Sequence, residues 1–253
     1  MKSTTDIHWN ERALSVKDDI EVKIMDIFQR NLEYAEIQKW LRPDMQVLEV
    51  GCGNGFSTEV FAAHAKTVDA FDYAEAMVER AKERVKSGKV HFFHDNILQP
   101  KSISKTYDAV ICVRVLINLR NLDEQKTAIA NMSRFVKPGG YLILAEGYTE
   151  GFDALTEIRK KVGLPPVAPA KINFYAKRNQ LDDAFAAYTL EDEFHLGMYD
   201  YLTRVFYPLV VGPENAKHNT EFSEKAAALA AVFNPPDMKR FSRLQGLLLK
   251  KKA

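Results

Sequence analysis

The chain has 253 residues, of which 46% are hydrophobic and 27% charged, so it can bury the core of one large domain. Its formal net charge of +1 offers no basic surface for nucleic acid or an anionic membrane. Two cysteines cannot form a disulfide framework, and no apolar run reaches the roughly 18 residues of a membrane span. We therefore expect a soluble cytoplasmic protein, a monomer or homodimer, with no nucleic-acid or membrane partner.

The first 40 residues predict a helical cap ahead of the first strand. Trp9 is the large apolar anchor of a polar stretch over residues 1–14. Residues 15–18 resemble a capping box, and apolar residues follow at a near-helical period from Ile20 to about Leu41. This helix would either pack on the sheet edge or close over a ligand. Packing is the favoured role for Tyr34, whereas Trp9 is equally suited to a ligand wall.

A glycine-rich turn organises the chain. Residues 47–50 form a short β-prone run, and Gly51, Gly53 and Gly55 follow at alternate positions before a helical pattern begins. Glycines permit positive φ and let a ligand lie against bare backbone, while the N–H groups at a helix start need partners. A strand, a glycine turn and a helix in this order predict a nucleotide-type site.

The spacing within the turn argues against a dinucleotide. The dinucleotide fingerprint needs a third small residue at the position where this chain has Phe56. Glu49 lies two residues before the first glycine. Its carboxylate would repel a pyrophosphate and attract a cationic amino-acid group, so an NAD-dependent oxidoreductase is disfavoured.

Further strands alternate with helices along the chain. Apolar runs predict strands at residues 67–71, 90–94, 107–113 and 141–146. Helical patterns lie between them at residues 58–65, 74–85 and 123–135. This alternation predicts a parallel sheet with right-handed crossovers. Later in the chain we expect helices at 151–163 and 221–233, a sixth strand within 194–207 and a seventh at 243–251.

The pattern Glu49-x-Gly51-x-Gly53-x-Gly55 resembles motif I of the class I S-adenosylmethionine (SAM)-dependent methyltransferases. The turn Lys137-Pro-Gly-Gly before an apolar strand is also common in that family, and the resemblance covers residues 41–147. It implies an α/β fold with a doubly wound, mostly parallel seven-stranded sheet and helices on both faces. The implied single domain, 1–253, has an N-terminal cap (1–40), a cofactor-binding core (41–147) and acceptor-site insertions with strands six and seven (148–253).

The resemblance also implies SAM as the cofactor. Glu49 would offset its amino end, Asp72 would accept both ribose hydroxyls, and Asp95 would accept from the adenine amine. The alternatives are a helix cap for Asp72 and a simple turn at Asp95. The cofactor-binding residues implied are Glu49, Gly51, Cys52, Gly53, Asn54, Gly55, Asp72, Tyr73, Met77, Asp95, Asn96, Ile97, Val113 and Arg114.

The acceptor site should lie beyond the carboxyl ends of the strands, where ligands bind open α/β sheets. An acceptor of high pKa would need a base, for which the candidates are Glu146, Tyr148 and His195. An ordinary structural histidine is the favoured role for His195. Arg114 would pair with Glu49 or with an acidic ligand group, or form a buried ion pair. Arg114, Arg159 or Arg204 would be suited to an acceptor carboxylate or phosphate. The substrate-binding candidates are Trp9, Asn118, Asn173, Tyr175, Arg204 and Tyr207.

The sequence thus predicts transfer of a methyl group from SAM to a small-molecule acceptor, without a metal. A protein or RNA methyltransferase and a non-catalytic SAM-binding module are the alternatives. Residues 113–116, Val-Arg-Val-Leu, lack the Asn/Asp-Pro-Pro-aromatic motif of enzymes that methylate nucleic-acid amino groups. The acceptor and the atom methylated are left open.

Overall fold

The computed structural model describes residues 9, 11, 14–15 and 26–253. The predicted capping box and the first turns of the predicted N-terminal helix fall largely outside these residues. The helix is described from α3 (Ile27–Gln38), whose N-cap Asp26 accepts a hydrogen bond from the backbone N–H of Gln29 at 3.1 Å. Tyr34 lies in the core, 4% exposed, with its ring edge-on to Phe61, which agrees with its favoured packing role.

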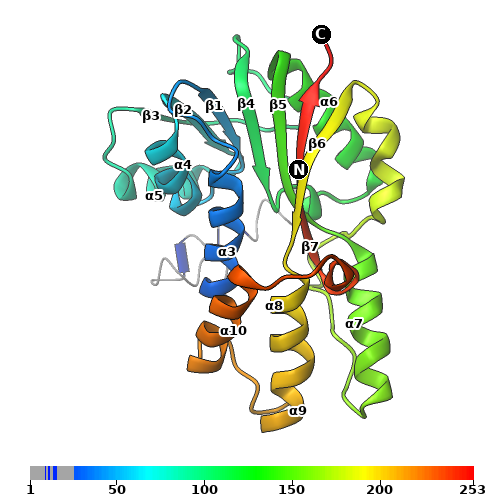
Figure 1. Ribbon diagram of the computed structural model, residues 1–253. Helices are drawn as coiled ribbons and strands as arrows, with labels where there is room; N and C mark the ends of the chain where they lie inside the picture. The colour runs from blue at the N-terminus through cyan, green and yellow to red at the C-terminus, as the bar shows by residue number, and fades with distance from the viewer. Residues whose placement is uncertain (1–8, 10, 12–13, 16–25) are drawn as a thin grey trace.

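One seven-stranded sheet forms the centre of the molecule (Figure 1). Its strands are β1 (Gln46–Val50), β2 (Thr67–Asp72), β3 (Val90–His94), β4 (Tyr107–Val113), β5 (Val136–Gly147), β6 (Tyr188–His195) and β7 (Leu244–Lys251). Their order across the sheet is β3-β2-β1-β4-β5-β7-β6. Pairing is parallel from β3 to β5, and β7 runs antiparallel to both β5 and β6.

Helices cover both faces of the sheet, as predicted. One apolar cluster joins the sheet to α3, α4 (Phe56–His64) and α5 (Glu75–Arg84). A second cluster joins the opposite face to α6 (Leu122–Phe135) and the 3-10 helix η2 (Arg178–Phe185). Alternate residues of β1 divide between the clusters, because Val47 packs in the first and Leu48 in the second. The sheet is therefore doubly wound.

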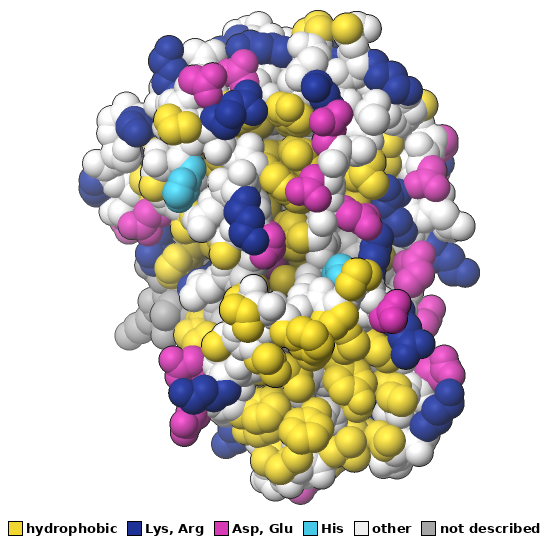
Figure 2. Space-filling model, viewed as in Figure 1, with side chains coloured by type: hydrophobic (Ala, Val, Ile, Leu, Met, Phe, Trp, Pro, Cys, Tyr) yellow, Lys and Arg dark blue, Asp and Glu magenta, His cyan; other side chains and the backbone are white. Residues whose placement is uncertain are grey.

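A second group of helices lies beyond the carboxyl ends of the parallel strands (Figure 1). Its members are α7 (Thr149–Lys161), α8 (Gly197–Tyr201), the π-helical turn η3 (Leu202–Phe206), α9 (Tyr207–Val211), α10 (Glu221–Val232) and the 3-10 helix η4 (Pro236–Phe241). They belong to the two predicted insertions, after β5 and between β6 and β7. Among the helices of this group α10 packs on α3, so α3 connects the sheet to the group. Figure 2 shows apolar side chains gathered on the surface of this region.

The predicted position of the sixth strand was wrong. Strand β6 ends at His195, and most of the range 194–207, expected to hold the strand, is helical from Gly197 on. Tyr199 and Thr203 are buried four residues apart, a helical spacing that the high aromatic content of the segment obscured. The true strand lies at the sheet edge and is mostly exposed between its ends, so it carries little apolar signal.

The predicted turn at residues 137–140 also differs from the structure. Strand β5 runs through it, and the register against β4 shifts between Tyr107 and Ala109. Gly139, with φ of +72°, lies within the extra residues of β5. The two glycines therefore form a bulge rather than a turn before the strand.

We expect Gly197→Ala to destabilise the fold. A Cβ at Gly197 would lie 1.8 Å from the carbonyl oxygen of Met238, so α8 must move away from η4. Overpacking of this kind costs about 1–3 kcal/mol. Gly88→Ala is the matched control, because a Cβ there meets nothing within 4 Å. Urea unfolding should show a clear loss of unfolding free energy for Gly197→Ala and almost none for Gly88→Ala. Equal stability of the two variants would contradict the close packing of α8 on η4.

Candidate functional site

The glycine turn joins β1 to α4 in a left-handed backbone. Gly51, Gly53 and Gly55 have φ of +74°, +55° and +84°. The N–H groups of Gly51 and Cys52 donate to the carbonyl of Phe71 at 2.8 and 3.0 Å, which ties the turn to β2. Such φ values strain any residue with a Cβ, so glycine is needed at all three positions. The predicted Cys52 and Asn54 are fully buried within the turn.

Glu49 lies at the carboxyl end of β1, under the start of α4. It is 2% exposed, and the hydroxyls of Ser57 and Thr58 donate to its two carboxylate oxygens. These hydroxyls belong to the first turn of the helix, where anions are favoured. The structure therefore holds a buried carboxylate beside the turn, at the position that the sequence indicated.

Asp72 connects the glycine turn to the loop that follows β2. One of its oxygens accepts from the N–H of Gly53 and the other from the N–H of Ala74, both at 2.9 Å. Asp72 is 7% exposed. The adjoining Tyr73 contacts His94 through its carbonyl at 2.9 Å, and Met77 is buried on α5. The predicted binding role of Asp72 stays a prediction, and its position next to Gly53 agrees with it.

Asp95 organises the loop after β3. Its carboxylate accepts hydrogen bonds from the backbone N–H groups of Asn96, Lys101 and Ser102, at 2.8 to 3.1 Å. The Asn96 side chain accepts in turn from the N–H of Leu98, and Ile97 is buried. The turn-forming role is thus present, and recognition of an adenine edge by the same loop stays a prediction.

Trp9 and Asn118 connect two loops at the carboxyl edge of the sheet. The indole of Trp9 packs against Ala74 and Met77 after β2. Its Nε1 donates to Oδ1 of Asn118 at 3.2 Å, and Asn118 Nδ2 donates to the carbonyl of Arg114 at 2.6 Å. The two predicted acceptor-site residues therefore lie together, at the ends of β2 and β4.

Arg114 follows the buried Val113 at the end of β4 and pairs with Glu33 of α3. Nε of Arg114 donates to Oε2 of Glu33 at 3.1 Å, and Nη2 donates to Oε1. Of the alternatives for Arg114, the structure shows a buried ion pair, formed with Glu33 rather than Glu49 because α3 reaches over the strand ends. Burial alone would lower the pKa of Arg114, but the Glu33 charge raises the pKa, so the guanidinium stays charged.

Glu146, a candidate base, is buried near the carboxyl end of β5. The side chain is 1% exposed and accepts from the N–H groups of Val115 and Leu116 at 2.8 and 2.9 Å. Ile117 N–H lies at 3.4 Å and the Cys112 thiol at 3.5 Å. Burial raises the pKa of Glu146 to about 7. This carboxyl holds the backbone of the loop after β4, and its catalytic role stays a prediction.

Tyr148 and His195 are each held within their own elements, and their catalytic roles stay predictions. Tyr148 is 1% exposed within the second apolar cluster, where burial raises its pKa. His195 ends the edge strand β6, and its Nδ1 accepts from the N–H of Gly197 at 3.3 Å. Burial lowers the pKa of His195, and the nearby Lys239 lowers it further. Both residues serve the packing of their own elements.

The structure places Arg204, Tyr207 and Arg159 in the helical group. Arg204 donates to Asp26 at 3.0 Å and contacts His218. Tyr207 stacks on Phe222 with ring centroids 4.4 Å apart. Arg159 donates to backbone carbonyls, among them that of Arg204. Burial lowers the pKa of Arg204 to about 10. None of the three lines the cavity described next, and their roles toward an acceptor stay predictions.

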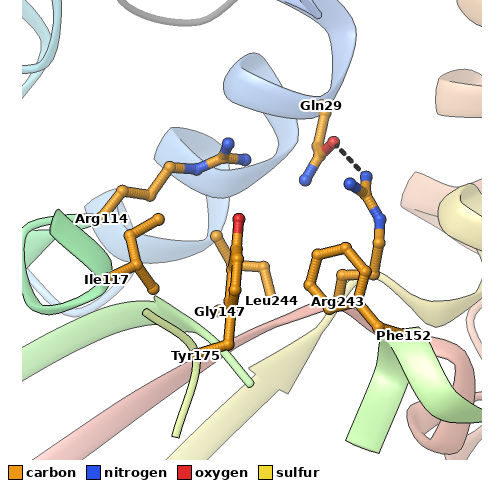
Figure 3. Close-up of a pocket in the computed structure, with 8 residues that line it drawn as sticks. All are labelled: Gln29, Arg114, Ile117, Gly147, Phe152, Tyr175, Arg243 and Leu244. Atoms are coloured by element: carbon orange, nitrogen blue, oxygen red, sulfur yellow. Dashed lines mark hydrogen bonds between the residues drawn. The ribbon is translucent and has the colours of Figure 1, made fainter. Parts of the chain in front are cut away.

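A small cavity, open to solvent, lies beside the loop after β4 (Figure 3). It is lined by Gln29, Arg114, Ile117, Gly147, Phe152, Tyr175, Arg243 and Leu244. Of the sequence-predicted residues, Arg114 and Tyr175 line it. Asn173 supports the second, since its Nδ2 donates to the Tyr175 hydroxyl at 2.9 Å.

Sequence reasoning missed Gln29, Phe152 and Arg243. Gln29 lies on a predicted helix, but nothing in the sequence indicates which face meets the strand ends. Arg243 stands at the expected start of the last strand. An antiparallel last strand would bring that start to the carboxyl edge, which is the one signal available for it.

Among the described residues, no group of histidine, cysteine and acidic side chains could hold a metal ion, and no helix is long and apolar enough to span a membrane. Residues 47–140 match a family model described as a methyltransferase domain.

Two sequence relatives and one solved structure are similar to this chain. A demethylmenaquinone methyltransferase of Renibacterium salmoninarum is 30% identical over 54% of this chain and 59% of its own length. A ubiquinone biosynthesis O-methyltransferase of Rickettsia canadensis is 31% identical over 40% of this chain and 42% of its own length. The chain thus spans about half the length of these curated relatives. The N-methyltransferase NodS of Bradyrhizobium japonicum, solved with S-adenosylhomocysteine (SAH), has the same fold, with a TM-score of 0.60 and 18% identity over 99% of both chains.

We expect stability to depend on pH through Glu146. Its pKa is about 7 in the fold against 4.5 in an unfolded chain, so the unfolded state loses its proton first as pH rises. The free energy of unfolding should therefore fall by up to about 3 kcal/mol between about pH 4.5 and pH 7, where both states become ionised. Glu146→Gln lacks this dependence. Urea unfolding of both proteins at pH 5 and pH 8 measures the difference, and parallel pH profiles would contradict it.

Proposed function

Because this chain belongs to the class I SAM-dependent methyltransferase family, we propose that it transfers the methyl group of SAM to a small-molecule acceptor and releases SAH. The observation that carries the proposal is the left-handed glycine turn flanked by two buried carboxylates, Glu49 and Asp72. A sulfonium nucleoside presents an ammonium group and a ribose diol, and both are donors that carboxylates accept. The donor and acceptor chemistry of the turn therefore fits the cofactor.

The cofactor supplies an electrophilic methyl group, and the chain must align an acceptor behind it and exclude water. Gly51 of the glycine turn packs closely against Val115 of the loop after β4, because a Cβ added to Gly51 would lie only 2.2 Å from Cγ2 of Val115. The loop that packs against the glycine turn therefore also leads into the cavity at Arg114 and Ile117. We infer that the acceptor enters from this cavity, next to the cofactor.

None of the eight residues that line the cavity is a carboxylate or a histidine. The main contribution of this chain is then to align the acceptor with the methyl group, rather than to remove a proton with a carboxylate or a histidine. An acceptor whose reacting atom already carries an available lone pair suits this lining. The relatives named for demethylmenaquinone and ubiquinone biosynthesis support a small molecule over a protein or RNA.

The direct test is incubation of the purified protein with methyl-labelled SAM and a protein-free, RNA-free metabolite extract. We expect label in a small organic product and a matching amount of SAH. Label only in added protein or RNA would favour those acceptors instead. Tight SAH binding with no transfer from any source would indicate a binding module without chemistry.

Gly51→Ala should weaken SAH binding at least tenfold. The substitution forces a Cβ at φ of +74° and against Val115, so the turn and the loop after β4 must separate. Gly139→Ala is the matched control, because Gly139 has φ of +72° and a Cβ there meets nothing within 4 Å. Calorimetric titration with SAH compares the two variants. Equal affinities in both would show that the turn does not hold the cofactor.

A further inference from the structure

We propose that the cavity beside the loop after β4 binds an anionic group of the acceptor, a carboxylate or a phosphate, between Arg114 and Arg243. The inference rests on the proposed methyl transfer, because it names the class of molecule that would occupy the acceptor side. Figure 3 shows the two guanidinium groups on opposite sides of the cavity, with Gln29 and the Tyr175 hydroxyl between them.

The two arginines face the cavity with their acidic partners behind them. The side chains of Arg114 and Arg243 are 23% and 18% exposed, whereas those of their partners Glu33 and Asp200 are both 0% exposed. Arg114 bonds Glu33 through Nε and Nη2, and Arg243 bonds Asp200 through the same two nitrogens. Within the described part of the chain, Nη1 of neither arginine donates a hydrogen bond. Each guanidinium therefore keeps donors for a ligand.

Gln29 adds a third donor. Its Oε1 accepts from Nη2 of Arg243 at 3.0 Å, which fixes the amide so that Nε2 is directed into the cavity (Figure 3). Gln29 is 3% exposed, so this orientation is held by packing as well as by the hydrogen bond.

Tyr175 adds a fourth donor. Its hydroxyl points into the cavity (Figure 3) and accepts from Nδ2 of Asn173 at 2.9 Å. A hydroxyl that already accepts from an amide has its own proton available to donate. Tyr175 is held in place by Phe152, with ring centroids 4.7 Å apart.

The lining thus presents several donors and apolar walls. Two guanidinium groups and two neutral donors match the oxygens of a carboxylate or phosphate. Phe152, Ile117 and Leu244 suit an apolar or aromatic body attached to that anion. The backbone supports the same conclusion, because Arg114 adopts φ of +55°, an uncommon strained conformation for a residue with a side chain. This conformation directs its side chain toward α3 and the cavity.

The experiment is titration of the SAH-saturated protein with three aromatic probes, namely benzoate, phenyl phosphate and the neutral benzamide. Tyr175→Phe and Gln29→Met each remove one donor while keeping the size of the side chain and leaving both ion pairs in place. Tyr207→Phe is the matched control, since Tyr207 stacks on Phe222 away from the cavity. SAH affinity and the unfolding midpoint are measured for every variant to confirm that the fold is intact.

We expect at least one anionic probe to bind at least tenfold more tightly than benzamide. Each cavity variant should then weaken that probe about tenfold, as for one lost charge-assisted hydrogen bond, and Tyr207→Phe should not. The stronger of the two anions identifies the acceptor group as carboxylate or phosphate. Equal binding of all three probes, or unchanged anion affinity in both cavity variants, would overturn the inference. A parent protein that does not bind SAH at all would instead contradict the proposed function.

Discussion

The arrangement of the glycine turn depends on the buried carboxylate of Glu49 at the end of β1. A carboxylate that is 2% exposed would be unstable without donors, and the hydroxyls of Ser57 and Thr58 supply them from the first turn of α4. The same hydrogen bonds fix the start of the helix relative to the strand, so the glycine turn between them has little freedom. Asp72 completes the arrangement by accepting from Gly53 in the middle of the turn. Negative charge and bare backbone are thereby held together before any ligand arrives, which favours a cationic nucleoside over a phosphate.

A second set of ionic contacts joins the helical group to the sheet. Asp26, at the start of α3, accepts from Tyr199 at 2.7 Å and from Arg204, while Arg243 connects Asp200 to Gln29. Burial alone would raise the pKa of Asp26, but the hydrogen bond with His218 and the charge of Arg204 hold that pKa well below its usual range. Because α3 brings Gln29 to the cavity and Glu33 to Arg114, the contacts that secure the helices also position the donors that line the cavity.

Much of the fold was predictable from the sequence, because parallel strands buried on both faces carry strong apolar runs. β4, for example, begins and ends at the predicted residues, Tyr107 and Val113. Prediction failed for strand β6, because this strand lies at the sheet edge and most of its side chains are exposed, so it lacks an apolar run. The glycine turn and its carboxylates were recognisable because they are local in sequence. The cavity was not, since Gln29, Tyr175 and Arg243 meet only through tertiary packing. Glu146 shows what sequence alone cannot reveal about a polar residue at a strand end, namely that its carboxylate accepts hydrogen bonds from the backbone of a neighbouring loop.

The most direct test of the central claim compares the affinity of the parent protein and Glu49→Gln for SAH and for 5′-methylthioadenosine, which lacks the aminoacyl group. If Glu49 attracts the ammonium group, calorimetry should show at least a tenfold loss for SAH and little change for the truncated nucleoside. Equal losses for both ligands would mean that Glu49 only supports the turn. Unchanged binding of both would contradict any part for this carboxylate in choosing the cofactor.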